Sequence, residues 1–166
     1  RPTTMSLAGE SKLLLLLLIA NGAPIIAAAL CGARWAWPLD GGRVLADGQR
    51  LFGTTKTWRG LLAALLLTTG GALLLGVPAA VGALIGLLAM AGDLLSSFIK
   101  RRLGRPSSSM MLGLDQVPEA LLPLLAVREA FALDAPAIVV TVIAFLLLDL
   151  LLSQVLYRLG IRQRPY

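Results

Sequence analysis

Three carboxylates and a lysine in the middle of the sequence could act together in a chemical step. Asp93, Ser97 and Lys100 follow one another at spacings of four and three residues, so a helix would place a carboxylate, a hydroxyl and an ammonium group on one face. Asp93 lies within a long apolar run, where an unpaired charge is costly, so it is either a functional group or half of a buried ion pair with a lysine. Asp115 and Glu119 lie one helical turn apart, and together with Asp93 these carboxylates could bind Mg²⁺ through oxygen ligands.

A polar segment between residues 34 and 60 could bind phosphate. Its basic residues alternate with glycines, and three threonines stand near its end. Glycines allow backbone N–H groups to approach a ligand, threonines add hydroxyls, and lysine and arginine add positive charge. The Walker pattern GxxxxGK[ST] is absent. The same composition suits a solvated loop at a membrane surface, so both interpretations remain open.

The composition indicates that these polar segments lie between membrane helices. Of 166 residues, 57% are hydrophobic, the mean hydropathy is +0.83, and there is no histidine. Leucine and alanine runs of this length predict an all-α, polytopic integral membrane protein. The net charge of +6 comes from basic residues between the apolar runs, and no basic stripe interleaved with aromatic residues is present, so we expect no nucleic-acid partner. Without histidine, any chemistry depends on carboxylates, hydroxyls, lysines, arginines and a hard cation.

The apolar runs predict five transmembrane helices in a single domain covering residues 1–166. The expected spans are about 13–32, 61–77, 78–99, 117–135 and 136–157, with loops at 33–60 and 100–116. Asn21 and Pro24 interrupt the first span, and we interpret them as kink or packing residues that could line a cavity. The fourth span contains Arg128 and Glu129, so it either crosses a thinned bilayer or lies in the interface. Asp149, inside the fifth span, suits a structural or a functional role equally.

The distribution of basic residues predicts the orientation. Five lysines and arginines lie in 34–59, four in 100–105 and three in the tail after 157, whereas the turn at 76–78 has none. The positive-inside rule then places the amino terminus outside and the carboxyl terminus in the cytoplasm. Both polar loops meet on the cytoplasmic side of the cell membrane. Their combined residues are suited to metal-assisted phosphoryl or nucleotidyl transfer to a lipid phosphate.

Paired motifs across nearly the whole chain resemble those of the CDP-archaeol synthase family, membrane cytidylyltransferases related to CDP-diacylglycerol synthase. The motifs are DGGR at 40–43, DGQR at 47–50, KTWRG at 56–60, GDLLSSFIKRR at 92–102 and DQ at 115–116. The resemblance implies a five-span α-helical enzyme that uses Mg²⁺ to transfer CMP from CTP to an unsaturated dialkylglycerol phosphate. The implied acceptor is an archaeal-type 2,3-di-O-geranylgeranylglycerol phosphate or a similar lipid phosphate, and diphosphate is released.

The resemblance also implies roles for individual residues. Asp93 and Asp115 would be catalytic, metal-linked carboxylates, with Lys100 as the third catalytic group. Nucleotide or phosphate binding would involve Asp47, Gly48, Arg50, Lys56, Thr57, Arg59, Ser97 and Arg101. The family usually has a second Asp three residues after the first, and this chain has Pro118 there. Either Glu119 replaces that Asp as a metal ligand or the second metal contact is absent.

Other functions remain open at this stage. An enzyme of the CDP-diacylglycerol synthase type and a small membrane transporter could use the same intramembrane carboxylates. A CDP-alcohol phosphotransferase would require DGxxARx8GxxxDxxxD, into which the DGQR at 47–50 does not continue. A purely structural membrane subunit would show no dependence on nucleotide. The sequence is also compatible with a homo-oligomer.

Overall fold

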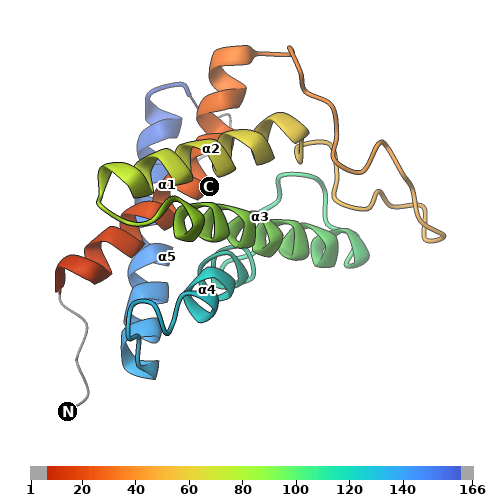
Figure 1. Ribbon diagram of the computed structural model, residues 1–166. Coiled ribbons are helices and arrows are strands. Elements are labelled where there is room, and N and C mark those ends of the chain that lie inside the picture. The colour runs from red at the N-terminus through yellow and green to blue at the C-terminus, as the bar shows by residue number, and fades with distance from the viewer. Residues whose placement is uncertain (1–6, 162–166) are drawn as a thin grey trace.

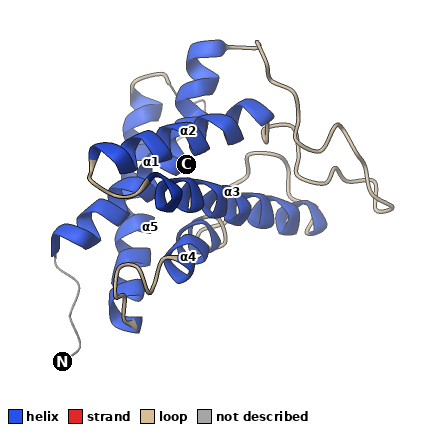
Figure 2. Cartoon of the chain, viewed as in Figure 1, coloured by secondary structure: helices blue, strands red, loops and turns tan. Residues whose placement is uncertain are grey.

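The structure is a computed structural model, and it describes residues 7–161 of the chain. Within that range the secondary structure is helical, without strands (Figure 1, Figure 2). The helices in chain order are α1 (Leu7–Cys31), α2 (Trp58–Leu74), α3 (Ala79–Arg102), α4 (Gln116–Ala126) and α5 (Ala135–Arg158). The prediction of an all-α protein with five helices is therefore confirmed. The first six residues and the basic residues Arg162 and Arg164 of the expected tail lie outside the described residues.

Three of the helices are long and apolar enough to cross a membrane. These are α1, α3 and α5, whereas α2 is a shorter apolar helix of 17 residues. Helix α1 begins earlier than expected and continues through Pro24, and α3 continues through its basic residues as far as Arg102. The basic end of α3 therefore belongs to the helix, where lysine and arginine interact favourably with the carboxyl-terminal dipole.

The fourth helix is shorter than predicted. We expected a span over 117–135, but α4 ends at Ala126 and residues 127–134 form turns and extended backbone. Its 11 residues rise only about 16 Å, roughly half the thickness of a hydrocarbon core. The apolar run is followed directly by Arg128 and Glu129, both of which lie in the turns. A helix that reaches charged residues after so few apolar ones has little apolar surface left to bury.

The helices pack in sequence, with α1 against α2 and α3, α3 against α4, and α5 against both α1 and α4. Leu16, Ala72, Ile85, Leu124 and Phe145 are all buried in one cluster, so all five helices contribute to one core. Helices α2 and α3 pack so closely that a side chain at Gly82 would overlap Ala72. Glycines at a helix interface allow this close approach.

The chain alternates between two ends of the bundle. The start of α1, the α2–α3 turn and the turn after α4 share one small pocket, lined by Lys12, Pro78 and Phe131 among others. The opposite end collects the loop at 32–57, the end of α3, the start of α4 and the end of α5. The two polar loops predicted to meet are therefore brought together.

Candidate active site

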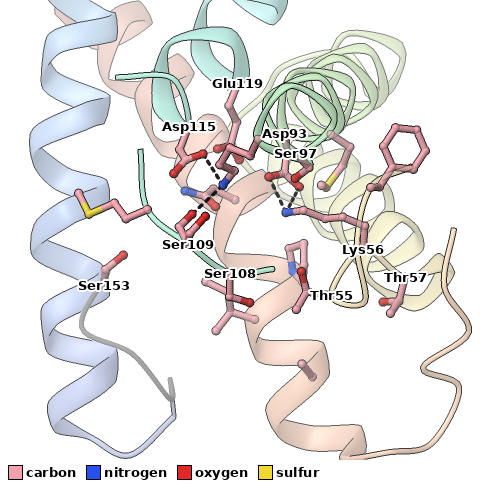
Figure 3. Close-up of a pocket in the computed structure, with 18 of the residues that line it drawn as sticks. Thr55, Lys56, Thr57, Asp93, Ser97, Ser108, Ser109, Asp115, Glu119 and Ser153 are labelled. Carbon is pink, nitrogen blue, oxygen red and sulfur yellow. Dashed lines mark hydrogen bonds and ion pairs between the residues drawn. The ribbon is translucent and has the colours of Figure 1, made fainter. Parts of the chain in front are cut away.

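A pocket of about 540 Å³ lies at this end of the bundle, where the end of α1 joins the four segments named above. The end of α1 and the end of α5 form its apolar part, and the loop before α2, the end of α3 and the start of α4 form its polar part. Figure 3 shows Asp93, Asp115 and Glu119 close together, with Lys56 reaching toward them from the loop. The residues predicted to share one face of a helix, Asp93, Ser97 and Lys100, all line this pocket.

Lys56 and Asp93 form the contact that joins the loop to α3. The Lys56 ammonium group donates to both carboxylate oxygens of Asp93 at 2.6 Å. The two side chains are 23% and 20% exposed, so the pair is partly shielded but remains open to the pocket. A hydrogen-bonded ion pair in such a setting is stronger than one on an open surface.

Lys100 and Asp115 form a second pair of the same kind. The Lys100 ammonium lies 2.6 Å from Asp115 Oδ1 and also donates to the carbonyl oxygen of Ser109 at 2.9 Å. The other carboxylate oxygen of Asp115 accepts from the Met111 backbone N–H at 2.8 Å. Asp115 is thereby held at the start of α4, opposite the end of α3.

Glu119 is the third predicted carboxylate, and it lines the same pocket while only 5% exposed. No hydrogen bond or ion pair from residues 7–161 reaches its carboxylate. Its position depends on Gly92, because a side chain there would overlap the backbone of Pro118 and Glu119. The helix α3 therefore approaches α4 closely at the residue before Asp93, which brings Glu119 beside it.

A fourth carboxylate, Asp149 of α5, connects three helices. It accepts hydrogen bonds from Asn21 Nδ2 at 2.6 Å and from Gln116 Nε2 at 3.1 Å. These bonds tie α1 and the start of α4 to α5 through amide donors. Asn21 and Pro24 line the pocket, as the sequence suggested for this interrupted part of α1.

Arg59 and Arg101 line the pocket but use several of their donors to hold the backbone. Arg59 Nη1 donates to the carbonyl oxygens of Gly32 and Arg34 at 2.9 and 2.6 Å, just beyond the end of α1. Arg101 donates from Nη2 to the Pro106 carbonyl at 2.7 Å and from Nη1 to Ser107 Oγ at 3.1 Å. Thr57, also predicted to bind nucleotide, caps α2 by accepting from the Gly60 N–H.

Three predicted binding residues, Asp47, Gly48 and Arg50, do not line the pocket. Arg50 instead bonds Asp40 from Nη2 at 2.6 Å and from Nε at 3.3 Å, and the Asp40 side chain is fully buried. Asp40 also accepts from the backbone N–H groups of Gly42 and Phe52. Burial raises the pKa of Asp40, but these bonds lower it more, so its pKa lies below the ordinary 3.8. The bonds between Arg50 and Asp40 therefore order the backbone of the loop.

Arg102 fastens this loop to α3. It bonds Asp47 Oδ2 at 2.7 Å and donates to the Arg50 carbonyl at 2.7 Å, while its guanidinium lies 5.2 Å from the centre of the Phe98 ring. The backbone of the loop is ordered further by short bridges at its base and near its tip. Together these contacts fix the part of the loop that carries Lys56.

Several lining residues were not identified from the sequence. Ser108, Ser109 and Met110 lie in the predicted loop at 100–116 but were not singled out there, and Ser153 was not considered. The spacing of Ser153 four residues after Asp149 could have indicated a shared helix face. No comparable signal marks the serine segment, because its position depends on contacts with Lys100 and Arg101.

The chain resembles known archaeal proteins in sequence and in fold. The family model of CarS-like CDP-archaeol synthase matches residues 11–166. The CDP-archaeol synthase of Sulfurisphaera tokodaii is 36% identical over 156 residues, which cover 90% of each chain. That of Thermococcus onnurineus is 39% identical over 109 residues, or 59% of this chain and 61% of the relative, and that of Saccharolobus solfataricus is 46% identical over 85 residues, or 48% and 51%.

A solved structure described as an intramembrane enzyme for archaeal membrane lipid biosynthesis has the same fold. It superposes with a TM-score of 0.73 at 35% identity, covering 86% of this chain and 90% of that one. Together with the long apolar helices, this likeness identifies an integral membrane protein. The chain belongs to the CarS-like CDP-archaeol synthase family.

Proposed function

We propose that this protein transfers CMP from CTP to the phosphate of an unsaturated dialkylglycerol phosphate and releases diphosphate. The observation that carries the proposal is the pair between Lys56 and Asp93, which brings a basic loop residue and an intramembrane carboxylate together across 37 positions of sequence. This contact joins cationic groups for phosphates to carboxylates for a metal ion. Both are required for nucleotidyl transfer.

The lipid phosphate would attack the α-phosphorus of CTP in line with the departing diphosphate. A phosphate monoester is already ionised near neutral pH, so the attack needs no strong general base, and the lack of histidine presents no difficulty. Lys56 and Lys100 line the pocket and would bind the phosphates of the two substrates. Their charges would stabilise the negative charge that accumulates as two anions react.

The carboxylates of the pocket fit a magnesium ion that is shared with a nucleotide. Among residues 7–161 no three acidic, histidine or cysteine residues form a complete metal cluster. Mg²⁺ in phosphate-transfer enzymes commonly uses one or two carboxylates and completes its shell with phosphate oxygens and water. Asp93 and Asp115 would be those ligands, with Glu119 available as a third. When bound, the ion would neutralise the triphosphate and polarise its α-phosphate.

The acceptor would approach from the lipid side. Pro24, Ile25 and Ala28 of α1 and Leu150 of α5 form the apolar wall of the pocket, and both helices are long enough to cross a membrane. A lipid phosphate could therefore place its head group among the lysines while its chains remain against apolar side chains. The archaeal-type dialkylglycerol phosphate named for the family satisfies this requirement.

The proposed topology has five crossings, with the amino terminus outside and the pocket on the cytoplasmic side of the cell membrane. The alternation of the chain between two ends of the bundle supports five crossings, the fourth of which combines α4 with the turns that follow it. The loop at 33–60 and the loop at 100–116 are the basic ones, so the positive-inside rule supports the orientation.

Incubation of purified protein with labelled CTP, Mg²⁺ and a series of lipid phosphates tests this function. We expect label in the lipid fraction with dialkylglycerol phosphate, a smaller amount or none with diacylglycerol phosphate, and none after chelation of the metal. Asp93→Asn should remove the activity, whereas Lys12→Met, at the other end of the bundle, should retain it. Absence of labelled lipid with every acceptor would refute the proposal.

A further inference from the structure

Both lysines of the pocket are bonded to carboxylates that the proposed function assigns to the metal ion. Lys56 covers both oxygens of Asp93 at 2.6 Å, and Lys100 lies 2.6 Å from Asp115 Oδ1. Asp93 belongs to α3 and Asp115 lies directly before α4, and the two lysines come from the loop and from α3. The same arrangement therefore occurs twice in one pocket, which is unexpected if the lysines serve only the nucleotide.

An ammonium group and a magnesium ion compete for these oxygens. Mg²⁺ binds oxygen at about 2.1 Å in near-octahedral geometry, and a lysine 2.6 Å from the same oxygens would lie beside a double positive charge. Repulsion between the two positive charges, the ammonium group and the metal ion, is strong in a partly shielded pocket. Binding of the metal at Asp93 is therefore stronger when Lys56 leaves.

We propose that Lys56 and Lys100 occupy the carboxylates in the nucleotide-free protein and move to the phosphates when the nucleotide binds, an inference that rests on the proposed function. The exchange gives each charged group an opposite partner in both states. Before it, two ammonium groups neutralise two carboxylates. After it, the carboxylates neutralise a divalent cation, and the ammonium groups offset part of the negative charge of the triphosphate. The lysines thus keep divalent cations weakly bound until CTP arrives.

The chemistry of the side chains supports this exchange. Lysine carries a compact charge on a flexible stem and can change partners by rotation, whereas arginine is held by several donors in a fixed plane. The nearby arginines make such multiple bonds, since Arg101 and Arg102 each bind a loop carbonyl. Within residues 7–161, the two pocket cations whose ion pairs to carboxylates are resolved are both lysines.

Titration of the full-length protein in detergent with Mn²⁺, without nucleotide or lipid, tests the exchange. Nucleotide must be omitted because CTP itself chelates the metal. We expect Lys56→Met to bind Mn²⁺ roughly tenfold more tightly than wild type, the effect of losing one competing ion pair. The same variant should bind CTP more weakly in the presence of a chelator. Adding Asp93→Asn to Lys56→Met should abolish the gain.

Lys12→Met is the matched control, because it removes the same side chain at the far pocket and should leave Mn²⁺ affinity unchanged. If Lys56→Met does not fold, Lys100→Met applies the same test at Asp115. Equal or weaker Mn²⁺ binding in a folded pocket-lysine variant would overturn the exchange. If Mn²⁺ binding is not tighter in the variant but wild type still labels lipid from CTP, the exchange is refuted and the proposed function stands.

Discussion

Two regions of the same loop use ion pairs in different ways. Around Asp40 the carboxylate side chain is fully buried and is bonded by Arg50 and by two backbone N–H groups. At the end of the loop, Lys56 bonds Asp93 with both side chains about one-fifth exposed to the pocket. The first carboxylate has its acceptor positions filled by its own loop, whereas the second is bonded by one lysine side chain with a flexible stem.

This difference separates residues that build the site from residues that can react in it. A carboxylate bonded by a planar guanidinium and by backbone groups cannot release them without unfolding its segment. A carboxylate bonded by one lysine at a pocket wall can exchange that partner for a metal ion. Sequence motifs do not distinguish the two, because both contain an acidic residue beside glycine and a basic residue nearby.

The largest effect should come from Asp93→Asn. This change removes the charge that binds Lys56 and, in our proposal, Mg²⁺, so we expect a loss of about 100-fold or more in CDP-lipid formation. The side chain keeps its size, and the protein should still be extracted as a folded species. Incorporation of labelled CTP into lipid measures the effect. Turnover equal to that of wild type would show that Asp93 has no role in the reaction.

Gly92→Ala should disturb the site without changing any charge. The added methyl group would overlap the Pro118 and Glu119 backbone, and overpacking of this kind costs about 1–3 kcal/mol. We expect a lower melting temperature and reduced activity as α4 moves away from α3. Gly70→Ala is the control, because a methyl group there meets nothing within 4 Å, and equal behaviour of the two variants would contradict the packing argument.

Asp40→Asn and Arg50→Gln test whether Arg50 builds the loop or binds phosphate. If the pair only orders the loop, both changes should raise the KM for CTP by a similar factor, about tenfold for a loss near 1.4 kcal/mol. The kcat should change less, because neither residue lines the pocket. A large effect of Arg50→Gln with none from Asp40→Asn would indicate that Arg50 binds the nucleotide.

The acid stability of the loop should depend on Asp40. Because the pKa of Asp40 is lower in the folded protein than the ordinary 3.8, its ionised form stabilises the fold above that value. This contribution disappears as the pH falls through the lower folded value. At the base of the loop the backbone N–H of Trp58 donates a hydrogen bond to the carbonyl oxygen of Trp37. The fluorescence emission of these tryptophans should report a transition below pH 3.8 in wild type. Persistence of that same transition in Asp40→Asn would assign it to another group.

The smallest effect should come from Asp47→Ala. Asp47 is 41% exposed in its pair with Arg102, and exposed pairs contribute about 0–1 kcal/mol. Arg102 also keeps its bond to the Arg50 carbonyl. The KM for CTP should therefore change less than about threefold. A much larger increase would place Asp47 in nucleotide binding, as the motif alone suggested.

The sequence predicted the helices well where apolar length decided the outcome. Four expected spans correspond to α1, α2, α3 and α5, because long apolar runs have few alternatives to a helix in a membrane. The fourth span was too long because Arg128 and Glu129 interrupt its apolar surface, and local turns satisfied the backbone instead. The end of α3 was placed too early, since basic residues were interpreted as loop.

The candidate site was predictable where residues share a helix face and unpredictable where tertiary contacts decide. Spacing alone brought Asp93, Ser97 and Lys100 to one pocket. It could not show that Arg50 bonds Asp40, or that the serines at 108 and 109 line the pocket, because these positions depend on how two loops pack. The partners of Asp149 were also beyond prediction, since they come from α1 and α4.

Calorimetric titration with CTP in the presence of Mg²⁺ tests most directly whether this pocket is the nucleotide site. A lysine bonded to a phosphate contributes about 1.5–3 kcal/mol, so Lys56→Met should weaken CTP binding by roughly 10- to 100-fold. Lys12→Met should bind CTP as wild type does. If folded Lys56→Met binds CTP with the affinity of wild type, the pocket between the loop and α3 is not the site where CTP binds.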